Sequence, residues 1–382
     1  MGAIDTWPIR SPVETYILPG ETLPSLFGEL WRDVYELPEN EALRRRFTDP
    51  KFVLPGWPIY FPSDLTIDRP ISRHLHPPDI ESPGTIYFWG NAPMGDLIAQ
   101  SGLLQQIKLQ SPARLVLVAK YAWIIESADE QHSIEDVEGA VDFIKGRYVP
   151  GDLVFVPENL GQHFQDPYFN AVFPRSDTHR YLLQRSLPLN MLWYHAGMYG
   201  FKVPQKPRVT KPARNVLKKN TIHVHTGSWD CMRRLKVADV VGMQRQIQRM
   251  GYRVEVSSDD IILNTLNRIG VHVCAETRRS VDNVKRLRDA GANVVDCSVC
   301  DLLERVAQCR LFISPDTGPL WYRYALDAPT IAIQAHRSKQ WIWPPQASLS
   351  CYDKPLTFES DGLGGFDIDW LVAMVGERLE RN

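Results

Sequence analysis

Short apolar runs alternate with helix-like patterns from about residue 84 onward. In the first part of this region, three strand-like runs lie at 85–89, 115–118 and 153–156. The amphipathic stretches between them start at Asp96 and at 133–136, which resembles a capping box. This strand–helix–strand–helix–strand order predicts a parallel sheet with right-handed crossovers. Two further helices are expected at 178–185 and 188–199, before a linker at 203–212.

The same alternation continues more regularly after the linker. Strands are expected at 222–225, 253–256, 271–274, 293–295, 311–313 and 330–333. Helices are expected at 237–250, 261–269, 280–290, 299–308, 319–326 and 368–379. We therefore predict an α/β protein with two Rossmann-like doubly wound domains facing a central cleft. Ligands of such domains bind outside the carboxyl ends of the strands, so the turns after the strands are the places to search.

The N-terminal residues 1–83 differ from the rest of the chain in being rich in proline. They hold 13 of the 29 prolines, and one helix is expected at 21–47, broken near Pro38. Such a segment is expected to wrap a domain rather than form one. The predicted organisation is an extension at 1–83, an N-terminal domain at 84–205, a C-terminal domain at 206–345, and a tail at 346–382. The helix of the tail is expected to pack back on the N-terminal domain.

Composition narrows the function classes. The chain has 382 residues, of which 44% are apolar and 23% charged, with a formal net charge of −2. Disorder and a coiled coil are poor interpretations, and nucleic-acid binding is not expected without a basic excess. The apolar run 114–125 is interrupted by Lys120 and is too short to span a bilayer, although peripheral membrane contact stays open.

The cysteines and the N-terminus indicate a compartment. The N-terminus lacks the basic and apolar regions of a secretory signal, and the six cysteines are typical of reduced thiols, so a cytoplasmic protein is expected. Cys297 and Cys300 form a C-x2-C pair without a second pair at useful spacing. No metal site is therefore predicted.

The strongest candidate turn is 314–320. Asp316 is suited to cap the following helix, Gly318 leaves room beside a ligand, and Pro319 suits the first helical turn. The free N–H groups of such a helix start suit a diphosphate. The alternative is an ordinary capped helix start.

A second candidate turn follows the first strand of the second half. His225-Thr-Gly-Ser228 is followed by Arg233 and Arg234, whose guanidinium groups suit phosphate oxygens. The alternative is a polar loop with solvated arginines. His223 and His225 are expected on one strand face, where a packing role is favoured over a metal pair.

A third turn, 91–96, places Asp96 after the first strand of the first half. A carboxylate at this point is a general-base candidate, although shape alone favours a helix N-cap. Other motifs are absent or unconvincing: no G-x-G-x-x-G follows a strand, and no P-loop or G-x-S-x-G exists. Residues 362–365 are interpreted as a loop, and the D-x-D of 367–369 as a helix N-cap.

Three of these segments, in this order, resemble family 9 of the glycosyltransferases, the heptosyltransferase family. Met94-Gly-Asp-Leu97 is similar to its M-G-D motif, and 222–228 resembles its I-x-I-H-P-G-A-S turn, with Thr226 in place of proline. Ser314-Pro-Asp-Thr-Gly318 resembles its D-T-G donor loop, and 328–333 resembles the strand after that loop. The resemblance covers about 84–380 and implies the GT-B fold.

The resemblance also implies an inverting, metal-independent transfer from a nucleotide-diphosphate sugar to an acceptor hydroxyl. Asp96 would be the general base, with Met94 and Gly95 on the acceptor side. The implied donor-binding residues are Thr226, Gly227, Ser228, Arg233, Arg234, Asp316, Thr317 and Gly318. No cofactor is implied beyond the nucleotide sugar.

The family usually has histidine three residues after the D-T-G glycine, where this chain has Trp321. The donor sugar, its nucleotide and the hydroxyl acceptor are therefore left open. Trp321 and Glu276, which follows an expected strand end, complete the candidate donor-side residues. The alternatives are a catalytically silent GT-B-like protein that binds a nucleotide or a partner, and a GT-B-type sugar-nucleotide epimerase.

Overall fold

The computed structural model divides the chain into two compact units. It describes residues 13–16, 22–47, 58–62, 65, 84–90, 93–156, 163–164, 166, 168–173, 199, 201, 207–211, 217–227, 234–258, 283–333, 348–352, 356–359 and 362–380. The first unit comprises Met1–Ala92, Ala99–Arg208 and Gln340–Pro345. The second comprises Pro93–Ile98, Val209–Lys339 and Gln346–Asn382. The short segment Pro93–Ile98 thus belongs with the C-terminal part of the chain.

The N-terminal extension has a hydrophobic cluster of its own. Strands β1 (Val13–Tyr16) and β2 (Pro58–Phe61) pair antiparallel, beside helices α1 (Leu23–Phe27), α2 (Trp31–Glu36) and α3 (Glu41–Arg46). Short 3-10 turns η1 (Gly28–Leu30) and η2 (Pro38–Asn40) break the expected long helix. Buried Leu23, Val34, Leu43 and Ile59 belong to this cluster. The extension therefore forms a small folded part, where the sequence suggested only a wrapping segment.

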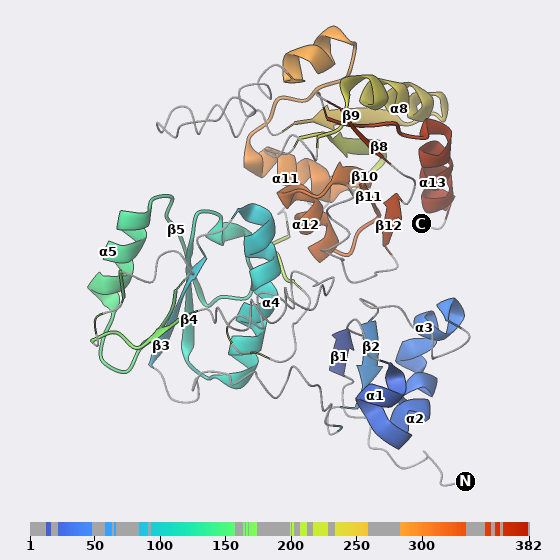
Figure 1. Ribbon diagram of the computed structural model, residues 1–382. Coiled ribbons are helices and arrows are strands. Elements are labelled where there is room, and N and C mark those ends of the chain that lie inside the picture. Colours follow the sequence, from blue (N-terminus) through green and yellow to red (C-terminus); the bar gives the residue numbers. More distant parts are fainter. Residues whose placement is uncertain are drawn as a thin grey trace. The chain divides into compact units, whose positions relative to one another are not determined.

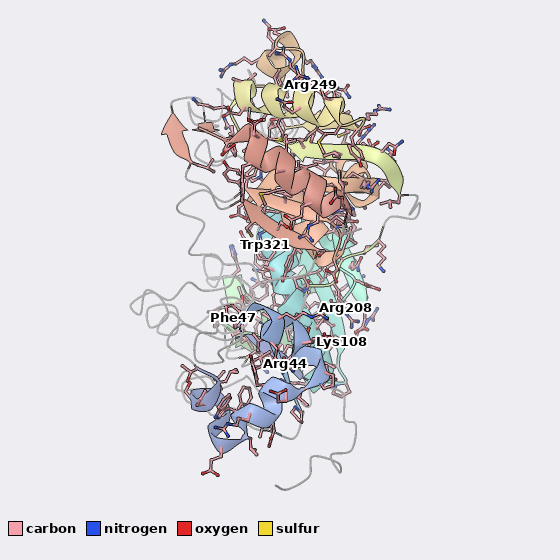
Figure 2. The ribbon with its side chains drawn as sticks, turned by 90° about the vertical axis from the view of Figure 1, so that its right-hand side faces the viewer. Arg44, Phe47, Lys108, Arg208, Arg249 and Trp321 are labelled. Atoms are coloured by element: carbon pink, nitrogen blue, oxygen red, sulfur yellow. The ribbon has the colours of Figure 1, made fainter. Side chains whose placement is uncertain are left out.

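Polar side chains fix the ends of these short helices. The Asn40 amide nitrogen donates to the carbonyls of Val34 and Tyr60 at 2.6 and 2.8 Å, and its oxygen accepts from the Tyr60 N–H. Arg44, labelled in Figure 2, donates to the carbonyls of Tyr35 and Leu37. The bonds from Arg44 satisfy carbonyls at the end of α2, and those of Asn40 join this end to β2.

The first unit contains a five-stranded parallel sheet in the order β5-β4-β3-β6-β7. Its strands are β3 (Thr85–Gly90), β4 (Arg114–Ala119), β5 (Glu130–Ser133), β6 (Leu153–Phe155) and β7 (Ala171–Val172). Helix α5 (Val137–Arg147) packs on the face that carries Tyr87, Val116 and Val154, and α4 (Met94–Gln110) lies on the other side (Figure 1). The predicted β-α-β-α-β order is found in these residues, with the additional strand β5 between β4 and α5.

Two local expectations in this unit were wrong. Ser133 ends β5 instead of capping a helix, and α5 begins three residues later, with Asp136 accepting the Gly139 N–H. The edge strands β5 and β7 were not predicted because they are short and mostly polar or half-buried, which weakens any apolar signal.

The second unit contains another five-stranded parallel sheet, in the order β12-β11-β10-β8-β9. Its strands are β8 (Lys218–His225), β9 (Arg253–Ser257), β10 (Cys309–Pro315), β11 (Thr330–Ile333) and β12 (Leu349–Tyr352). A parallel bridge from Val256 to Val294 extends it beyond β9. The expected strand 271–274 and helices 178–185 and 261–269 lie outside the described residues, as does most of 188–199.

Helices cover both faces of this second sheet. Helices α8 (Val237–Arg249) and α13 (Ile368–Glu380) pack on the face that carries Ile222, Val224 and Val254. Helices α11 (Val299–Gln308) and α12 (Gly318–Ala325) lie side by side on the opposite face (Figure 1). The described part of the tail thus packs within the second unit, where we expected α13 on the N-terminal domain.

Residues 362–365 also differ from the expectation of a loop. Strand β14 (Gly362–Gly364) pairs antiparallel with β13 (Thr357–Glu359) to form a hairpin. The glycines concealed this strand, because glycine is typical of turns and carries no apolar signal. Among the described residues, no helix is both long enough and apolar enough to cross a membrane.

Candidate functional site

Three turns of the second unit meet at the carboxyl edge of its sheet. Strands β10, β8 and β9 are parallel neighbours, so the residues that follow them leave the sheet on the same side. These residues are 316–318 after β10, 226–227 after β8, and Ser258 after β9. Two of the three turns predicted from the sequence therefore lie on adjacent strands.

The turn between β10 and α12 is held by its own hydroxyls. Ser314 Oγ lies 3.0 Å from Thr317 Oγ1 and donates to the Pro315 carbonyl at 2.8 Å. Thr317, not Asp316, occupies the N-cap position, and its side chain makes no capping bond to the helix. The first N–H groups of α12 are thus not bonded by the Thr317 side chain, which a helix start suited to an anion requires. Asp316 is half-buried.

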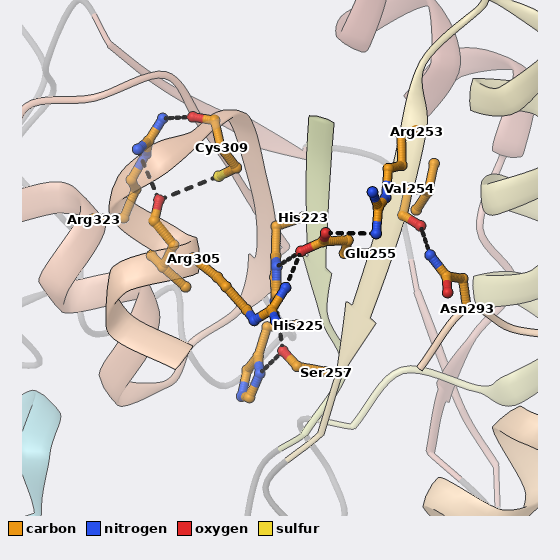
Figure 3. Close-up of polar contacts among 11 residues, drawn as sticks. His223, His225, Arg253, Val254, Glu255, Ser257, Asn293, Arg305, Cys309 and Arg323 are labelled. Carbon is orange, nitrogen blue, oxygen red and sulfur yellow. Dashed lines mark hydrogen bonds and ion pairs between the residues drawn. The ribbon is translucent and has the colours of Figure 1, made fainter. Parts of the chain in front are cut away.

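Helix α12 is anchored by a buried arginine. Arg323 is 1% exposed, and its guanidinium group donates to the carbonyls of Val306, Ala307 and Cys309 at 2.8 Å each (Figure 3). These carbonyls lie at the end of α11, where a positive charge is also favoured by the helix dipole. The arginine therefore ties the helix that follows the donor-like turn to the rest of the unit.

The turn after β8 is held by the neighbouring strand. Thr226 donates from its backbone N–H and from Oγ1 to the Ser257 carbonyl, at 2.8 and 3.2 Å. Its own carbonyl accepts the Leu235 N–H at 3.2 Å. Thr226 and Gly227 are buried, and Arg234 is 5% exposed. Thr226 therefore fixes the turn through bonds within the protein.

The two histidines of β8 are packing residues, as the sequence favoured. Both rings are fully buried on one face of the strand and share one hydroxyl. Ser257 Oγ lies 2.7 Å from His223 Nε2 and 2.9 Å from His225 Nδ1 (Figure 3). The Phe312 ring packs against His223, with 5.8 Å between centroids. Among the described residues, no group of three or more His, Cys, Asp or Glu side chains could hold a metal ion.

A buried carboxylate lies beside His223. Glu255 is 2% exposed and accepts from Arg305 at 2.9 Å, with Arg253 at 3.3 Å (Figure 3). His223 Nδ1 lies 3.8 Å from Glu255 Oε2, which is longer than a hydrogen bond, so we treat this contact as electrostatic. The His223 ring and the Arg305 guanidinium hold the pKa of Glu255 at about 2 against the opposing effect of burial. Full burial lowers the pKa of His223, because it disfavours the charged imidazole.

The sequence analysis missed Glu255, Ser257 and Arg305. A signal was nevertheless present, because polar residues alternate with apolar ones along β8 and β9. Thr221, His223 and His225 pair in register with Arg253, Glu255 and Ser257. Polar residues on a face covered by α11 indicate a buried hydrogen-bond network.

The first turn of α4 lies against the first turn of α12 within the second unit. A Cβ built on Gly95 would lie 2.8 Å from Trp321 Cδ1 and 3.6 Å from Gly318 Cα. A Cβ built on Gly318 would lie 3.0 Å from Met94 Cβ. A side chain at position 95 would thus clash with the indole, and one at position 318 would require Met94 to shift by a few tenths of an ångström. The structure thus brings together Met94, Gly95, Gly318 and Trp321, four of the residues selected from the sequence.

Asp96 lies inside α4 rather than at its N-cap. The helix begins at Met94, and the Pro93 carbonyl accepts the Leu97 N–H at 3.0 Å. The Asp96 carboxylate is half-buried in the first turn, where the helix dipole stabilises a negative charge. Ser228, Arg233 and Glu276, the remaining predicted site residues, lie outside the described residues.

No protein-family model matches the chain, and no curated protein matches it. Solved structures do. A family 9 glycosyl transferase from Veillonella parvula has a TM-score of 0.55 and 12% identity, over 80% of this chain and 99% of that one. The ADP-heptose lps heptosyltransferase II of E. coli has a TM-score of 0.54 and 13% identity, over 78% and 99%. The chain has the fold of these glycosyltransferases.

A third solved structure agrees with this assignment. The E. coli heptosyltransferase WaaC, solved with ADP, has a TM-score of 0.50 and 11% identity, over 77% of this chain and 99% of that one. At such identities the likeness establishes the fold, the two-unit α/β architecture expected from the sequence. The roles of individual residues must be argued from their own geometry.

Proposed function

We propose that this chain is an inverting glycosyltransferase that uses a nucleotide-diphosphate sugar. Asp96 takes the proton of an acceptor hydroxyl, whose oxygen attacks the anomeric carbon on the side opposite the diphosphate. The new carbon–oxygen bond forms as the bond to the diphosphate breaks, and the nucleoside diphosphate leaves with the electron pair. The shared fold supports sugar transfer as the reaction class.

The observation that carries the proposal is the approach of the two helix starts. Gly95 and Gly318 let the first turn of α4 lie directly against the first turn of α12. Asp96 follows Gly95, so its carboxylate belongs to the same first turn of α4, which lies against a helix start suited to an anion. A base and a leaving-group site near each other are what displacement at an anomeric carbon requires.

The leaving diphosphate needs compensating positive charge. In this proposal the charge comes from the N-terminus of α12 at Thr317 and Gly318, together with Arg233 and Arg234 after the 226–228 turn. No metal ion takes part. Asp316 and Trp321 contact the donor near its sugar, and Glu276 contacts the ribose. Met94 and Gly95 lie on the acceptor side.

The donor class is tested by ligand-induced stabilisation. Purified protein is heated with ADP-, GDP-, UDP- and dTDP-sugars in parallel, with the free sugars as controls. A donor present at 100 times its dissociation constant raises the unfolding free energy by about 2.7 kcal/mol, a clear shift in melting temperature. Stabilisation by at least one nucleotide sugar and by none of the free sugars is expected. No shift with any of the four would contradict the proposal.

A further inference from the structure

Ser257, the last residue of β9, contacts Thr226, the first residue after β8, and two histidines of that strand. Its carbonyl accepts both the N–H and the Oγ1 hydroxyl of Thr226. Its own hydroxyl lies between His223 Nε2 and His225 Nδ1, at 2.7 and 2.9 Å. The residue is fully buried. It therefore contacts no ligand itself, yet it holds the residues that lead into Gly227.

The charge of Glu255 sets the direction of these hydrogen bonds. Its ionised carboxylate lies 3.8 Å from His223 Nδ1 and favours a proton on that nitrogen. Because full burial disfavours a charged imidazole, His223 Nε2 then carries a lone pair and accepts a hydrogen bond from the Ser257 hydroxyl. With its one hydrogen directed to His223, the Ser257 oxygen in turn accepts a hydrogen bond from His225 Nδ1. A polar chain thus links four residues and ends at the base of the turn (Figure 3); its members are Glu255, His223, Ser257 and His225.

Burying this polar chain costs desolvation free energy, and filling the space between the helix and the sheet does not require it. Apolar side chains of similar volume would fill the same face without desolvating a carboxylate and three polar groups. The polar residues stand beside the turn after β8, and the opposite face of the same strands is apolar, with Ile222, Val224, Val254 and Val256. The polar character is therefore confined to the face that supports the turn.

We infer that Ser257 is a positioning residue for the phosphate-binding turn at Thr226 and Gly227, and that the polar chain beginning at Glu255 orients it. This inference rests on the proposed function, because it assigns the turn to the diphosphate of the donor. The hydroxyl holds the two imidazoles in one orientation, and the carbonyl holds Thr226. The N–H group of Gly227 is thereby fixed before the ligand binds, which lowers the entropic cost of binding.

The test compares nucleotide affinity with stability. Wild type and Ser257→Ala are titrated calorimetrically with ADP, GDP, UDP and dTDP, and both are melted without ligand. The matched control is Thr330→Val, which removes another buried hydroxyl of the same sheet, bonded to the Ala328 carbonyl at 2.7 Å near the amino end of β11. A purely structural role would lower the melting temperature of both variants and leave both affinities unchanged.

We expect Ser257→Ala to weaken binding of the nucleotide that wild type binds by about tenfold, the effect of roughly one buried hydrogen bond. Thr330→Val is expected to bind within about twofold of wild type. If Ser257→Ala does not fold, Ser257→Cys replaces it, because sulfur is similar in size and a poor hydrogen-bonding atom. Wild-type affinity in the folded Ser257 variant overturns the inference alone. Failure of wild type to bind any of the four nucleotides overturns the proposed function, and the inference with it.

Discussion

The indole ring of Trp321 lies against Gly95, so closely that the glycine has no room for a side chain. A Cβ at this position would lie 2.8 Å from Trp321 Cδ1, and real Cβ atoms do not approach so near. Trp321 is 4% exposed, and its ring meets the Tyr324 ring edge-on at 5.8 Å, so it has little freedom to move aside. The two residues therefore define the contact between the starts of α4 and α12.

Gly95→Ala is predicted to destabilise the protein. The added methyl group overpacks the contact with Trp321, which costs about 1–3 kcal/mol and outweighs the gain in helix propensity. Urea unfolding measures the change. Gly146→Ala is the matched control, because this glycine of α5 has open space around its Cβ and should gain about 0.5–1 kcal/mol.

Combining Gly95→Ala with Trp321→Leu tests whether contact with the indole ring causes the loss of stability. Trp321→Leu removes the ring that the new methyl group meets, so the double variant should lose less stability than the sum of the two single variants. Strict additivity of the two losses would show that the two side chains do not meet.

Arg323 is predicted to be essential for the stability of the second unit. Arg323→Leu leaves the buried carbonyls of Val306, Ala307 and Cys309 without their donor and is expected to cost about 2–4 kcal/mol. Arg323→Lys should restore little, because a single ammonium group cannot reproduce the planar fork. Thermal unfolding checks both variants. Arg249→Leu, at the exposed end of α8, should stay within about 0.5 kcal/mol of wild type.

The secondary structure was predictable where local signals are strong. The apolar strand 330–333 and the helix 299–308 agree with β11 and α11 to the residue, because the strand is a continuous apolar run and the helix has Ser298 and Asp301 as a capping box. Strands β12 and β14 lack such signals. They pair with β11 and β13, and this tertiary pairing supplies the hydrogen bonds that their local sequence does not predict.

The site was predictable in part, for a similar reason. Short motifs marked Gly95 and Gly318, whose role the structure explains by a steric contact between segments more than 200 residues apart. Nothing in the local sequence shows that Thr317 rather than Asp316 occupies the N-cap, or that Ser257 supports Thr226. Such relationships depend on strand register and on the helix that covers the strand.

Stability is predicted to fall in acid because of Glu255. Its pKa is about 2 in the folded protein against an ordinary value of 4.5, so its contribution is present above pH 4.5 and is lost as the pH falls towards 2. Unfolding free energies at pH 7, 5, 4 and 3 measure this loss. Glu255→Gln should lower stability at pH 7 and flatten the profile below pH 4.5.

An exposed carboxyl group supplies the comparison. Glu135, whose side chain is 57% exposed, lies 3.8 Å from Lys120. Glu135→Gln should leave both the stability at pH 7 and the steepness of its decline in acid close to those of wild type. If the unfolding free energy of Glu255→Gln falls as steeply in acid as that of wild type, Glu255 does not cause the loss of stability.

Asn40 is predicted to hold the N-terminal extension together. Asn40→Ala removes three hydrogen bonds that join β2 to the end of α2, and the extension should become much more sensitive to limited proteolysis. Asn220→Ala, an exposed position of β8, should be cleaved like wild type. Equal resistance of the two variants would show that these bonds do not stabilise the extension.

The central claim is that Asp96 is the base of a sugar transfer. The most direct measurement is the transfer rate of Asp96→Asn, with whichever nucleotide sugar stabilises wild type and an acceptor that it glycosylates, beside the affinity of the same variant for the matching nucleoside diphosphate. If Asp96 is the base, we expect a loss of transfer of about 100-fold or more with nucleotide affinity within about twofold of wild type, because the amide keeps the shape of the carboxylate and cannot take the proton. Transfer at the wild-type rate by Asp96→Asn would contradict this claim.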